Sequence, residues 1–254
     1  METIANAVNY EAHQLSDAHK LKRHSNFITM FSYMKNNNFL PMVKTVIFNI
    51  EKRILNGIQQ GLGVKMLFIP KKGPSYACSA SIEELDFNNN GKFYKEFFTL
   101  LPNVKEFYVN FMEDKIKESV EINDALQFLH LLKLFSNLDV ISLNIPHNSF
   151  VLPIFKTFLP SLLHVRSLIL VLANCSLTDA DFATFNQIAG LVDLEMLCVD
   201  VSNNKLTDHS TQTLQTLVKP PKLKSFYLKT YGNSIAASVI DDMEKKLDVS
   251  KVKY

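Results

Sequence analysis

The chain has 254 residues, and its 47% hydrophobic content is enough to bury an extended core, which excludes the disordered class. Its 27 basic and 25 acidic side chains leave a formal net charge of +2, so net charge predicts neither nucleic-acid binding nor binding to a membrane surface. The three cysteines lack CxxC spacing, which predicts neither a disulfide framework nor a zinc site and favours a reducing compartment.

The N-terminal region shows neither a secretory signal pattern nor a basic presequence, because acidic residues precede its first arginine, Arg23. The most apolar run, residues 167–173, is far shorter than the roughly 18 to 20 residues that span a bilayer. We therefore expect no membrane insertion and an intracellular, cytoplasmic location, with assembly inside an organelle left as an open alternative.

Residues 16–35 carry apolar side chains at helical intervals, and Ser16 is a suitable N-cap. The asparagine run at 36–38 then favours a turn. This pattern predicts an amphipathic helix within an N-terminal helical cap that covers residues 1–41.

From residue 42 to 137 the pattern changes to short apolar bursts with irregular spacing. Aligned on their first apolar residue, these bursts are Val43/Val46/Phe48/Ile50, Val64/Leu67/Ile69, Ile82/Leu85/Phe87 and Val104/Phe107/Val109/Phe111. The bursts start 21, 18 and 22 residues apart. We interpret this part as irregular repeats.

From residue 138 to 254 the bursts become regular. They are Leu138/Ile141/Leu143/Ile145, Val165/Leu168/Leu170/Leu172, Leu194/Leu197/Val199/Val201 and Leu223/Phe226/Leu228, and their starts at 138, 165, 194 and 223 lie 27, 29 and 29 residues apart. An asparagine or cysteine follows each burst, at Asn148, Cys175, Asn204 and Asn233. This pattern resembles the leucine-rich repeat family, in its helix-containing, ribonuclease-inhibitor-like subtype.

The resemblance implies an α/β fold: a leucine-rich repeat solenoid of about seven or eight units, with a parallel β-sheet on the concave side, helices on the convex side and the helical N-terminal cap at one end. The asparagine after the strand can satisfy backbone groups in the core, and Cys175 can replace it because a thiol tolerates burial. Thr178 with Asp181 and, in the next unit, Thr207 are expected helix caps. An amphipathic segment at 239–247 is the expected C-terminal capping helix.

Motifs for chemistry are few. The seven histidines form no metal-ligand spacing, and we expect no catalytic residues, no metal and no cofactor. The glycine-containing segment from Gly57 to Lys65 leaves a nucleotide-binding protein or enzyme as an alternative, although no lysine–serine or lysine–threonine pair follows it.

Residues that lie between inward-facing strand positions project from the opposite face of the sheet, and these predict a protein-binding strip on the concave face. The strip is aromatic and apolar, with some amides. Its predicted members are Ile47, Phe68, Tyr108, Asn110, Met112, Asn144, Ile169, Val171, Tyr227, Lys229 and Tyr231.

The resemblance implies a non-catalytic adaptor or a structural subunit of a larger complex that binds a protein partner. Three alternatives remain open. The insertion at 112–137 is a second possible binding surface, chain ends could cover part of the strip, and residues 39–41 with the N-terminal helix would suit the substrate-recognition adaptor of a ubiquitin ligase.

Overall fold

The computed structural model describes residues 35–36, 40–51, 64–71, 75–82, 95, 98–101, 103–112, 127, 129–135, 137–147 and 152–246. Most of the predicted N-terminal cap, the glycine-containing segment before Val64 and most of the insertion at 112–137 lie outside the described residues. At the end of the predicted helix at 16–35, Lys35 and the next residue, Asn36, are described, and both are helical.

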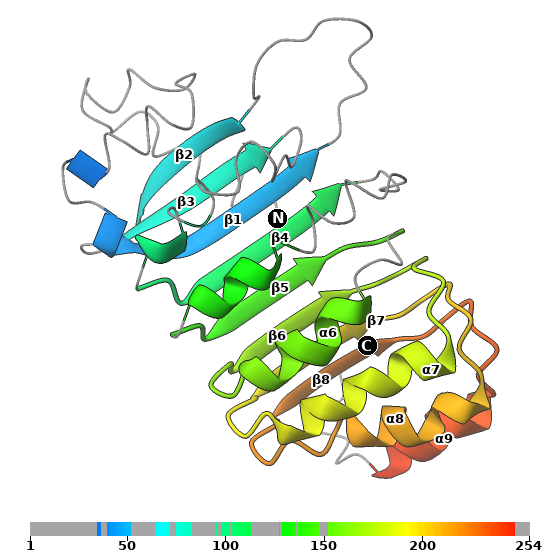
Figure 1. The fold of residues 1–254 in the computed structure, drawn as a ribbon. Helices are drawn as coiled ribbons and strands as arrows, with labels where there is room; N and C mark the ends of the chain where they lie inside the picture. The colour runs from blue at the N-terminus through cyan, green and yellow to red at the C-terminus, as the bar shows by residue number, and fades with distance from the viewer. Residues whose placement is uncertain are drawn as a thin grey trace, which may run out of the picture.

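One eight-stranded sheet organises the described chain, with the strand order β2-β3-β1-β4-β5-β6-β7-β8 (Figure 1). The strands are β1 (Val43–Glu51), β2 (Val64–Lys71), β3 (Ser75–Ile82), β4 (Glu106–Met112), β5 (Val140–Asn144), β6 (Ser167–Val171), β7 (Met196–Asp200) and β8 (Ser225–Lys229). Strand β1 and strands β4 to β8 pair in parallel, each with the next along the chain. With helices between the later strands, the fold is α/β, as predicted.

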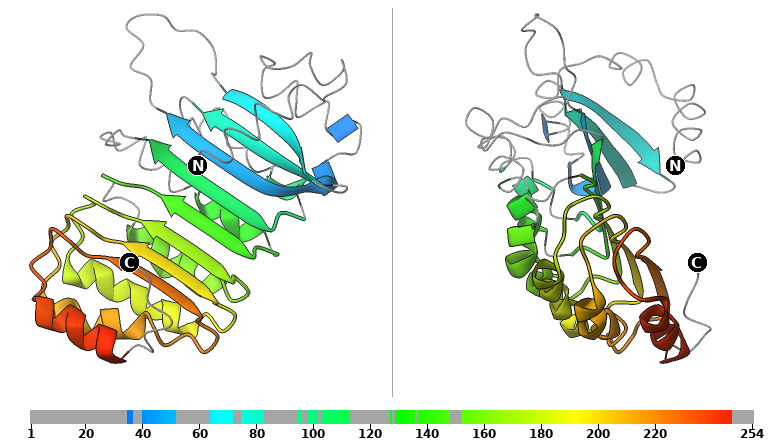
Figure 2. Two further views of the ribbon diagram at one scale, coloured as in Figure 1. Left: turned by 180° about the vertical axis from the view of Figure 1, so that it is seen from behind. Right: turned by 90° about the vertical axis from the view of Figure 1, so that its right-hand side faces the viewer.

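Among the described residues, short helices cover one face of the later strands and leave the other face open (Figure 2). They are η1 (Leu40–Met42), η2 (Leu131–Leu134), α6 (Leu152–Phe158) with η4 (Leu159–Ser161), α7 (Asp179–Phe182) with η5 (Ala183–Gly190), η6 (Asp208–Ser210) with α8 (Thr211–Thr216), and α9 (Ala237–Lys246). Within the described ranges, no helix has the length and apolar character needed to cross a bilayer. The continuous core lies between the sheet and this helical layer.

Period-two alternation explains how the strands face the core. Along β6, Leu168 and Leu170 are fully buried while Ile169 between them is half-buried, and β5 and β7 repeat this pattern. The predicted inward and outward positions of the regular registers are therefore confirmed for these strands.

The turns after β7 and β8 are built around the predicted asparagines, whereas Asn148 after β5 lies outside the described residues. Asn204 Oδ1 accepts from Leu177 N at 3.0 Å, while its Nδ2 donates to Leu172 O at 2.9 Å and to Val201 O at 2.8 Å. Asn233 repeats this geometry one unit later. The expectation that these amides satisfy backbone groups of the core is confirmed.

Cys175 occupies the same position one unit before Asn204. It is buried, and its thiol donates to Ile145 O at 3.2 Å. A thiol is a weaker hydrogen-bond donor than an amide, so the Cys175 donor contributes less at this turn than the Asn204 amide does in the next unit.

A second repeated feature is a residue with a left-handed backbone at the ninth position after each first apolar residue. Its φ is 63° at His147, 59° at Asn174, 53° at Asn203 and 72° at Gly232. Asparagine and glycine adopt this conformation at low cost. The four regular registers therefore share one turn geometry as well as one spacing.

The helix starts follow the predicted caps. Thr178 and Asp181 form a reciprocal capping box at α7, and Thr207 Oγ1 accepts from His209 N at the start of η6. Phe182, Phe185 and Leu214 on these helices are fully buried against the sheet. Helix α9 overlaps the predicted C-terminal capping segment and begins two residues before it, at Ala237.

The first part of the sheet differs from the prediction. Val64, Leu67 and Ile69 do not form a repeat strand between β1 and β4, because their strand β2 pairs antiparallel with β3 at the outer edge of the sheet. Strand β3 then pairs in parallel with β1, and β1 lies directly beside β4. The apolar pattern predicts the strand correctly but predicts the wrong neighbour for it, because periodicity does not specify pairing direction.

Candidate binding face

The open face is the side of the sheet away from α6, α7 and α8, and its residues come from β1 and from β4 to β8. Strand pairing aligns these residues in two columns that cross the strands. The first column contains Ile47, Tyr108, Ser142, Ile169, Cys198 and Tyr227, and the second contains Asn49, Asn110, Asn144, Val171, Asp200 and Lys229. We call these the first and second columns.

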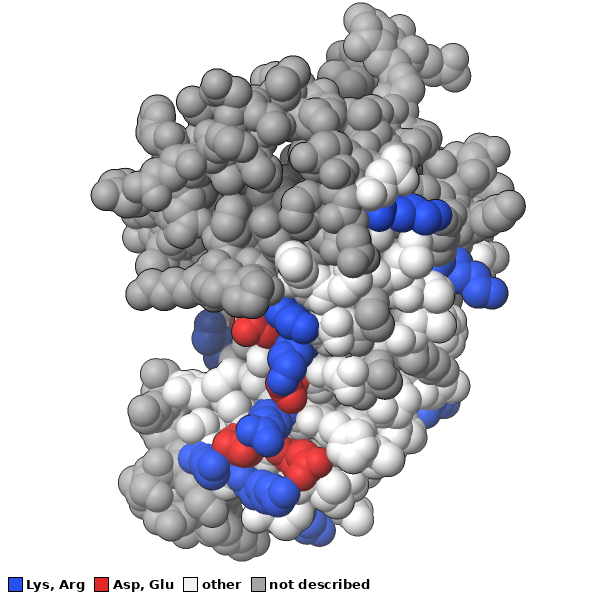
Figure 3. Space-filling view, turned by 90° about the vertical axis from the view of Figure 1, so that its left-hand side faces the viewer, with Lys and Arg blue, Asp and Glu red and all other residues white. Residues whose placement is uncertain are grey.

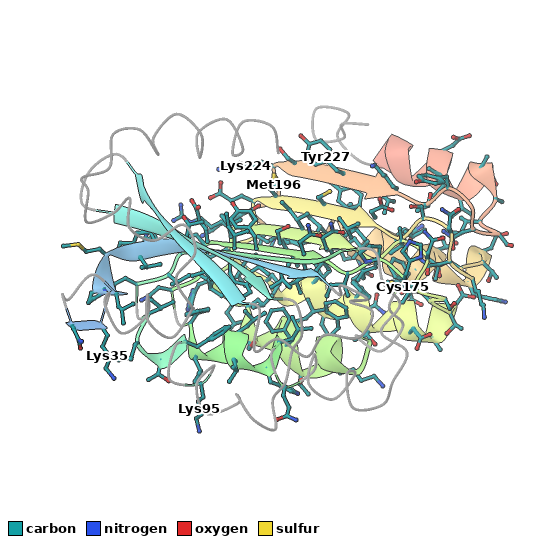
Figure 4. The ribbon with its side chains drawn as sticks, turned by 90° about the horizontal axis from the view of Figure 1, so that it is seen from above. Lys35, Lys95, Cys175, Met196, Lys224 and Tyr227 are labelled. Atoms are coloured by element: carbon teal, nitrogen blue, oxygen red, sulfur yellow. The ribbon has the colours of Figure 1, made fainter. Side chains whose placement is uncertain are left out.

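The first column brings together four predicted binding residues from distant parts of the sequence. Ile47, Tyr108, Ile169 and Tyr227 are all half-buried, with one side chain per strand. Adjacent strands are about 4.8 Å apart, and Ser142 of β5 and Cys198 of β7 lie in the same column between Tyr108, Ile169 and Tyr227. Figure 4 shows Tyr227 with Met196 and Lys224 on the side of the sheet away from α6.

The second column is polar at its β4 end and charged at its β8 end. Asn144 Nδ2 donates to Asn110 Oδ1 at 2.7 Å, which links the side chains of neighbouring strands. Lys229 Nζ lies 3.8 Å from Asp200 Oδ2. Val171 separates the two pairs, so the column carries no net charge across these five residues.

Burial changes the acid–base chemistry of the first column. It raises the pKa of the Tyr108 hydroxyl, and the neighbouring Glu106 carboxylate raises it further. Burial also raises the pKa of the Cys198 thiol, against the opposing effect of Lys229 and with a further increase from Asp200. At neutral pH both groups remain protonated, and Cys198 is not a ready nucleophile.

Three predicted residues do not join these columns. Phe68 is a correction: it pairs with Cys78, whose partner in β1 is Val46, so it belongs to the column of an inward residue and not to that of Ile47. Because β2 is antiparallel and shifted, the spacing that placed Phe68 on the open face does not apply.

Met112 and Tyr231 lie beyond the aligned columns. Met112 ends β4 opposite Glu51 and has no partner in β5. Tyr231 follows β8, has a relative exposure of 63%, and its carbonyl accepts from Asn203 N. Tyr231 therefore extends the accessible aromatic surface near the end of the sheet.

Sequence reasoning missed a third column, which contains the first residue of β4 to β8 and the third residue of β1. It contains Thr45, Glu106, Val140, Ser167, Met196 and Ser225. Thr45 Oγ1 donates to Glu106 Oε2 at 2.7 Å, and the buried Ser167 hydroxyl has no hydrogen-bond partner in the structure. The sequence could have predicted this column, because its residues lie two positions before those of the first column and alternate residues of a strand share one face.

A ladder of charges was also missed, at the edge where the strands begin (Figure 3). Its rungs are the residues that follow the first apolar residue of each register: Lys105, Asp139, Arg166, Glu195 and Lys224. Lys105 pairs with Asp139 at 3.3 Å and Lys224 with Glu195 at 2.7 Å. The alternation of sign from unit to unit was visible in the sequence once the registers were aligned.

In the part of the chain that the structure describes, no three histidine, cysteine or carboxylate side chains gather as a metal ion would require. Of the segment proposed for a nucleotide, only Val64 and Lys65 are described, and they begin β2. The chain matches no family model, and no curated protein is significantly similar to it.

Proposed function

We propose that this chain is a leucine-rich repeat solenoid of the ribonuclease-inhibitor-like subtype that acts without catalysis, as a protein-interaction adaptor or a structural subunit of a larger complex. In such a solenoid the open face is the concave face, and we propose that it binds the protein partner. Fold and function are separate claims, so each has its own support.

The solenoid interpretation is supported by contacts that recur once per unit. The Asn204 and Asn233 amides occupy equivalent turns, and the left-handed residues lie at one repeat position. Asp179 accepts from Thr207 N at 2.9 Å, and Asp208 accepts from Ala236 N at 2.7 Å, each in the following unit. Contacts of each unit mainly with its neighbours are typical of repeat proteins.

The binding proposal rests on one observation: Tyr108, Ile169 and Tyr227 lie in one register column of the open face and remain half-exposed. Aromatic side chains are enriched at the centres of protein interfaces and supply much of their binding energy. The neutral Asn110–Asn144 pair beside them offers amide groups to a polar partner without a charge to desolvate.

The test is affinity purification from cells with a triple variant, Tyr108→Glu, Ile169→Glu and Tyr227→Glu. We expect the recovery of specific partners to fall at least about tenfold, because three charges would be buried without partners. A matched control carries Gln187→Glu, Gln212→Glu and Ser238→Glu, which add the same charge at exposed positions of the helical side. Circular dichroism confirms that both variants fold. Unchanged recovery with the folded triple variant would reject the open face as the binding surface.

A further inference from the structure

Strand β8 lies at the edge of the described sheet, and some of its backbone hydrogen-bonding groups face away from β7. Ser225 N donates to Glu195 O, and Lys229 O accepts from Val201 N, so the odd-numbered residues of β8 bond to β7. In a parallel ladder the N–H and C=O groups of one residue point to the same neighbour. The groups of Phe226 and Leu228 therefore point away from β7, to a side where no strand of the described chain lies.

The apolar core is also less covered at this end. Val199 and Leu206, in the preceding unit, are fully buried. Their counterparts in the last unit, Leu228 and Ile235, are only partly buried, as are Val239 and Ile240 of the adjoining helix. One more strand with inward apolar residues would cover Leu228 as β8 covers Val199.

The charged residues of β8 and of the turn before it are all lysines. Lys222, Lys224 and Lys229 pair with Asp193 at 2.7 Å, Glu195 at 2.7 Å and Asp200 at 3.8 Å, all on the preceding unit. Their side chains nevertheless remain 60%, 70% and 67% exposed. A lysine ammonium has three N–H donors, so each of these lysines can donate to a second carboxylate as well.

Charges inside the stack interact with the units on both sides. Asp193 accepts from His164 in the unit before it and from Lys222 in the unit after it. Hydrogen bonds from these two residues lower the pKa of the Asp193 carboxyl, with Lys222 giving the larger effect. The three lysines of the last unit have such a neighbour on one side only.

The same charges argue against a second copy of this chain. Two β8 strands paired antiparallel would bring lysines opposite lysines, and like charges directly opposite are destabilising. Head-to-tail stacking would place β8 beside β2 of the next copy, whose sequence carries Lys65 and Lys71. Lysines on edge strands are a known protection against such self-association.

We propose that the β8 edge binds an acidic strand of a partner protein, which extends the sheet by one strand. The partner strand would carry carboxylates facing Lys222, Lys224 and Lys229, with apolar residues between them that cover Leu228. Strand β7 and the segment just before it show such a spacing of carboxylates, since Asp193, Glu195 and Asp200 form ion pairs with the same three lysines. Backbone pairing supplies the affinity of strand addition, while side chains supply the specificity. Lys229 belongs both to this edge and to the second column of the open face, but the edge is tested by backbone pairing of β8, so the test does not depend on the proposed function.

The probe is a synthetic peptide with the sequence of residues 193–201 and serine in place of Cys198, added to the full-length protein. Amide hydrogen exchange measured by NMR reads out strand addition residue by residue. We expect exchange at Phe226 and Leu228 to slow when the peptide is added, whereas exchange at Tyr227, whose amide already faces β7, stays unchanged. The proposal would be overturned if exchange at Phe226 and Leu228 stayed unchanged with about 1 mM peptide, a concentration that half-saturates a site whose dissociation constant is about 1 mM.

Fluorescence anisotropy of the labelled peptide then tests the charges. We expect Lys222→Glu, Lys224→Glu and Lys229→Glu together to weaken binding by about tenfold or more, since each exposed pair contributes modestly. A peptide with lysine in place of its three acids should restore binding to this variant. The control variant Lys105→Glu, Lys156→Glu and Lys205→Glu changes three exposed lysines elsewhere and should bind as the parent protein does. Equal binding to the parent by a peptide with asparagine and glutamine in place of the acids would show that the lysines only protect the edge, and would overturn the acidic specificity.

Discussion

The two ends of the sheet show two ways to build a parallel stack. From β6 to β8 each unit repeats one turn, with a left-handed residue followed by Cys175, Asn204 or Asn233, whose side chain bonds to the neighbouring unit. From β1 to β4 the strands pair in the same way, but the neighbour of β1 on the other side is a hairpin, β2–β3. Strand pairing alone therefore continues the sheet, while the repeated turn determines whether each added unit has the same shape.

The described part of the earlier region is held together by aromatic packing. Phe98, Phe107 and Phe135 form a cluster whose ring centroids are 5.0 to 5.7 Å apart. These rings come from β4 and from the segments before β4 and β5, so they join neighbouring units through side chains. The later region joins its units through buried amides and carboxylates as well. The difference predicts that the two regions respond to different substitutions.

The largest expected effect is in the aromatic cluster. Phe107→Ala removes a fully buried ring and its contacts with Phe98 and Phe135, and we expect the free energy of unfolding to fall by about 3–5 kcal/mol. Phe107→Leu, which keeps most of the volume, should cost markedly less. Urea denaturation followed by circular dichroism measures both. Equal losses for the two variants would mean that cavity formation does not dominate at this position.

An intermediate effect is expected at the repeated turn. Asn204→Leu leaves the Leu177 N–H and the Leu172 and Val201 carbonyls without their amide partner, and we expect a loss of about 3 kcal/mol in the free energy of unfolding. Asn233→Leu is the matched variant. Asn233 makes equivalent bonds but is half-exposed, so water can replace its amide and the loss should be about 1 kcal/mol. The same urea titration compares them, and a larger loss at Asn233 would contradict the role of burial.

The smallest effect links two units through Asp179. Its carboxylate accepts from Thr207 N at 2.9 Å, from Thr207 Oγ1 at 2.7 Å and from the Ser210 hydroxyl. Burial acts to raise the pKa of Asp179, but the hydrogen bonds from Ser210 and Thr207 outweigh it and hold the pKa below its ordinary value. The ionised form therefore stabilises the native state. This contribution is complete above the ordinary pKa and is lost as the pH falls through the lowered one.

We expect Asp179→Asn to lower the free energy of unfolding by about 1–2 kcal/mol at pH 7, because an amide has one acceptor oxygen in place of two. The difference from the parent protein should shrink below about pH 4, as the parent's carboxylate is protonated. Thermal unfolding at pH 7 and pH 3 measures this. Asp241→Asn, at an exposed position of α9, is the control and should change little at either pH. A difference that stays constant with pH would argue against the carboxylate as the source of the stability.

Much of the later region was predictable from local patterns. The alternation of apolar residues such as Leu168, Leu170 and Leu172 predicted which strand residues face the core. The pair Thr178 and Asp181 predicted where the helix begins. The task of Asn204 was also predictable, because a buried amide beside a turn must find backbone partners. In-register pairing of equivalent positions then placed Tyr108, Ile169 and Tyr227 on one column as expected.

The sequence by itself determined strands, caps and the repeat, since these depend on periodicity and on side chains within a few residues of each other. Only the tertiary structure decided that β2 turns back on β3, which removed Phe68 from the open face, because an apolar alternation is equally compatible with parallel and antiparallel neighbours. It also decided which strands lie at the edges of the described sheet. Strand β8 has a described neighbour on one side only, and a local sequence pattern carries no information about which strand lies at an edge.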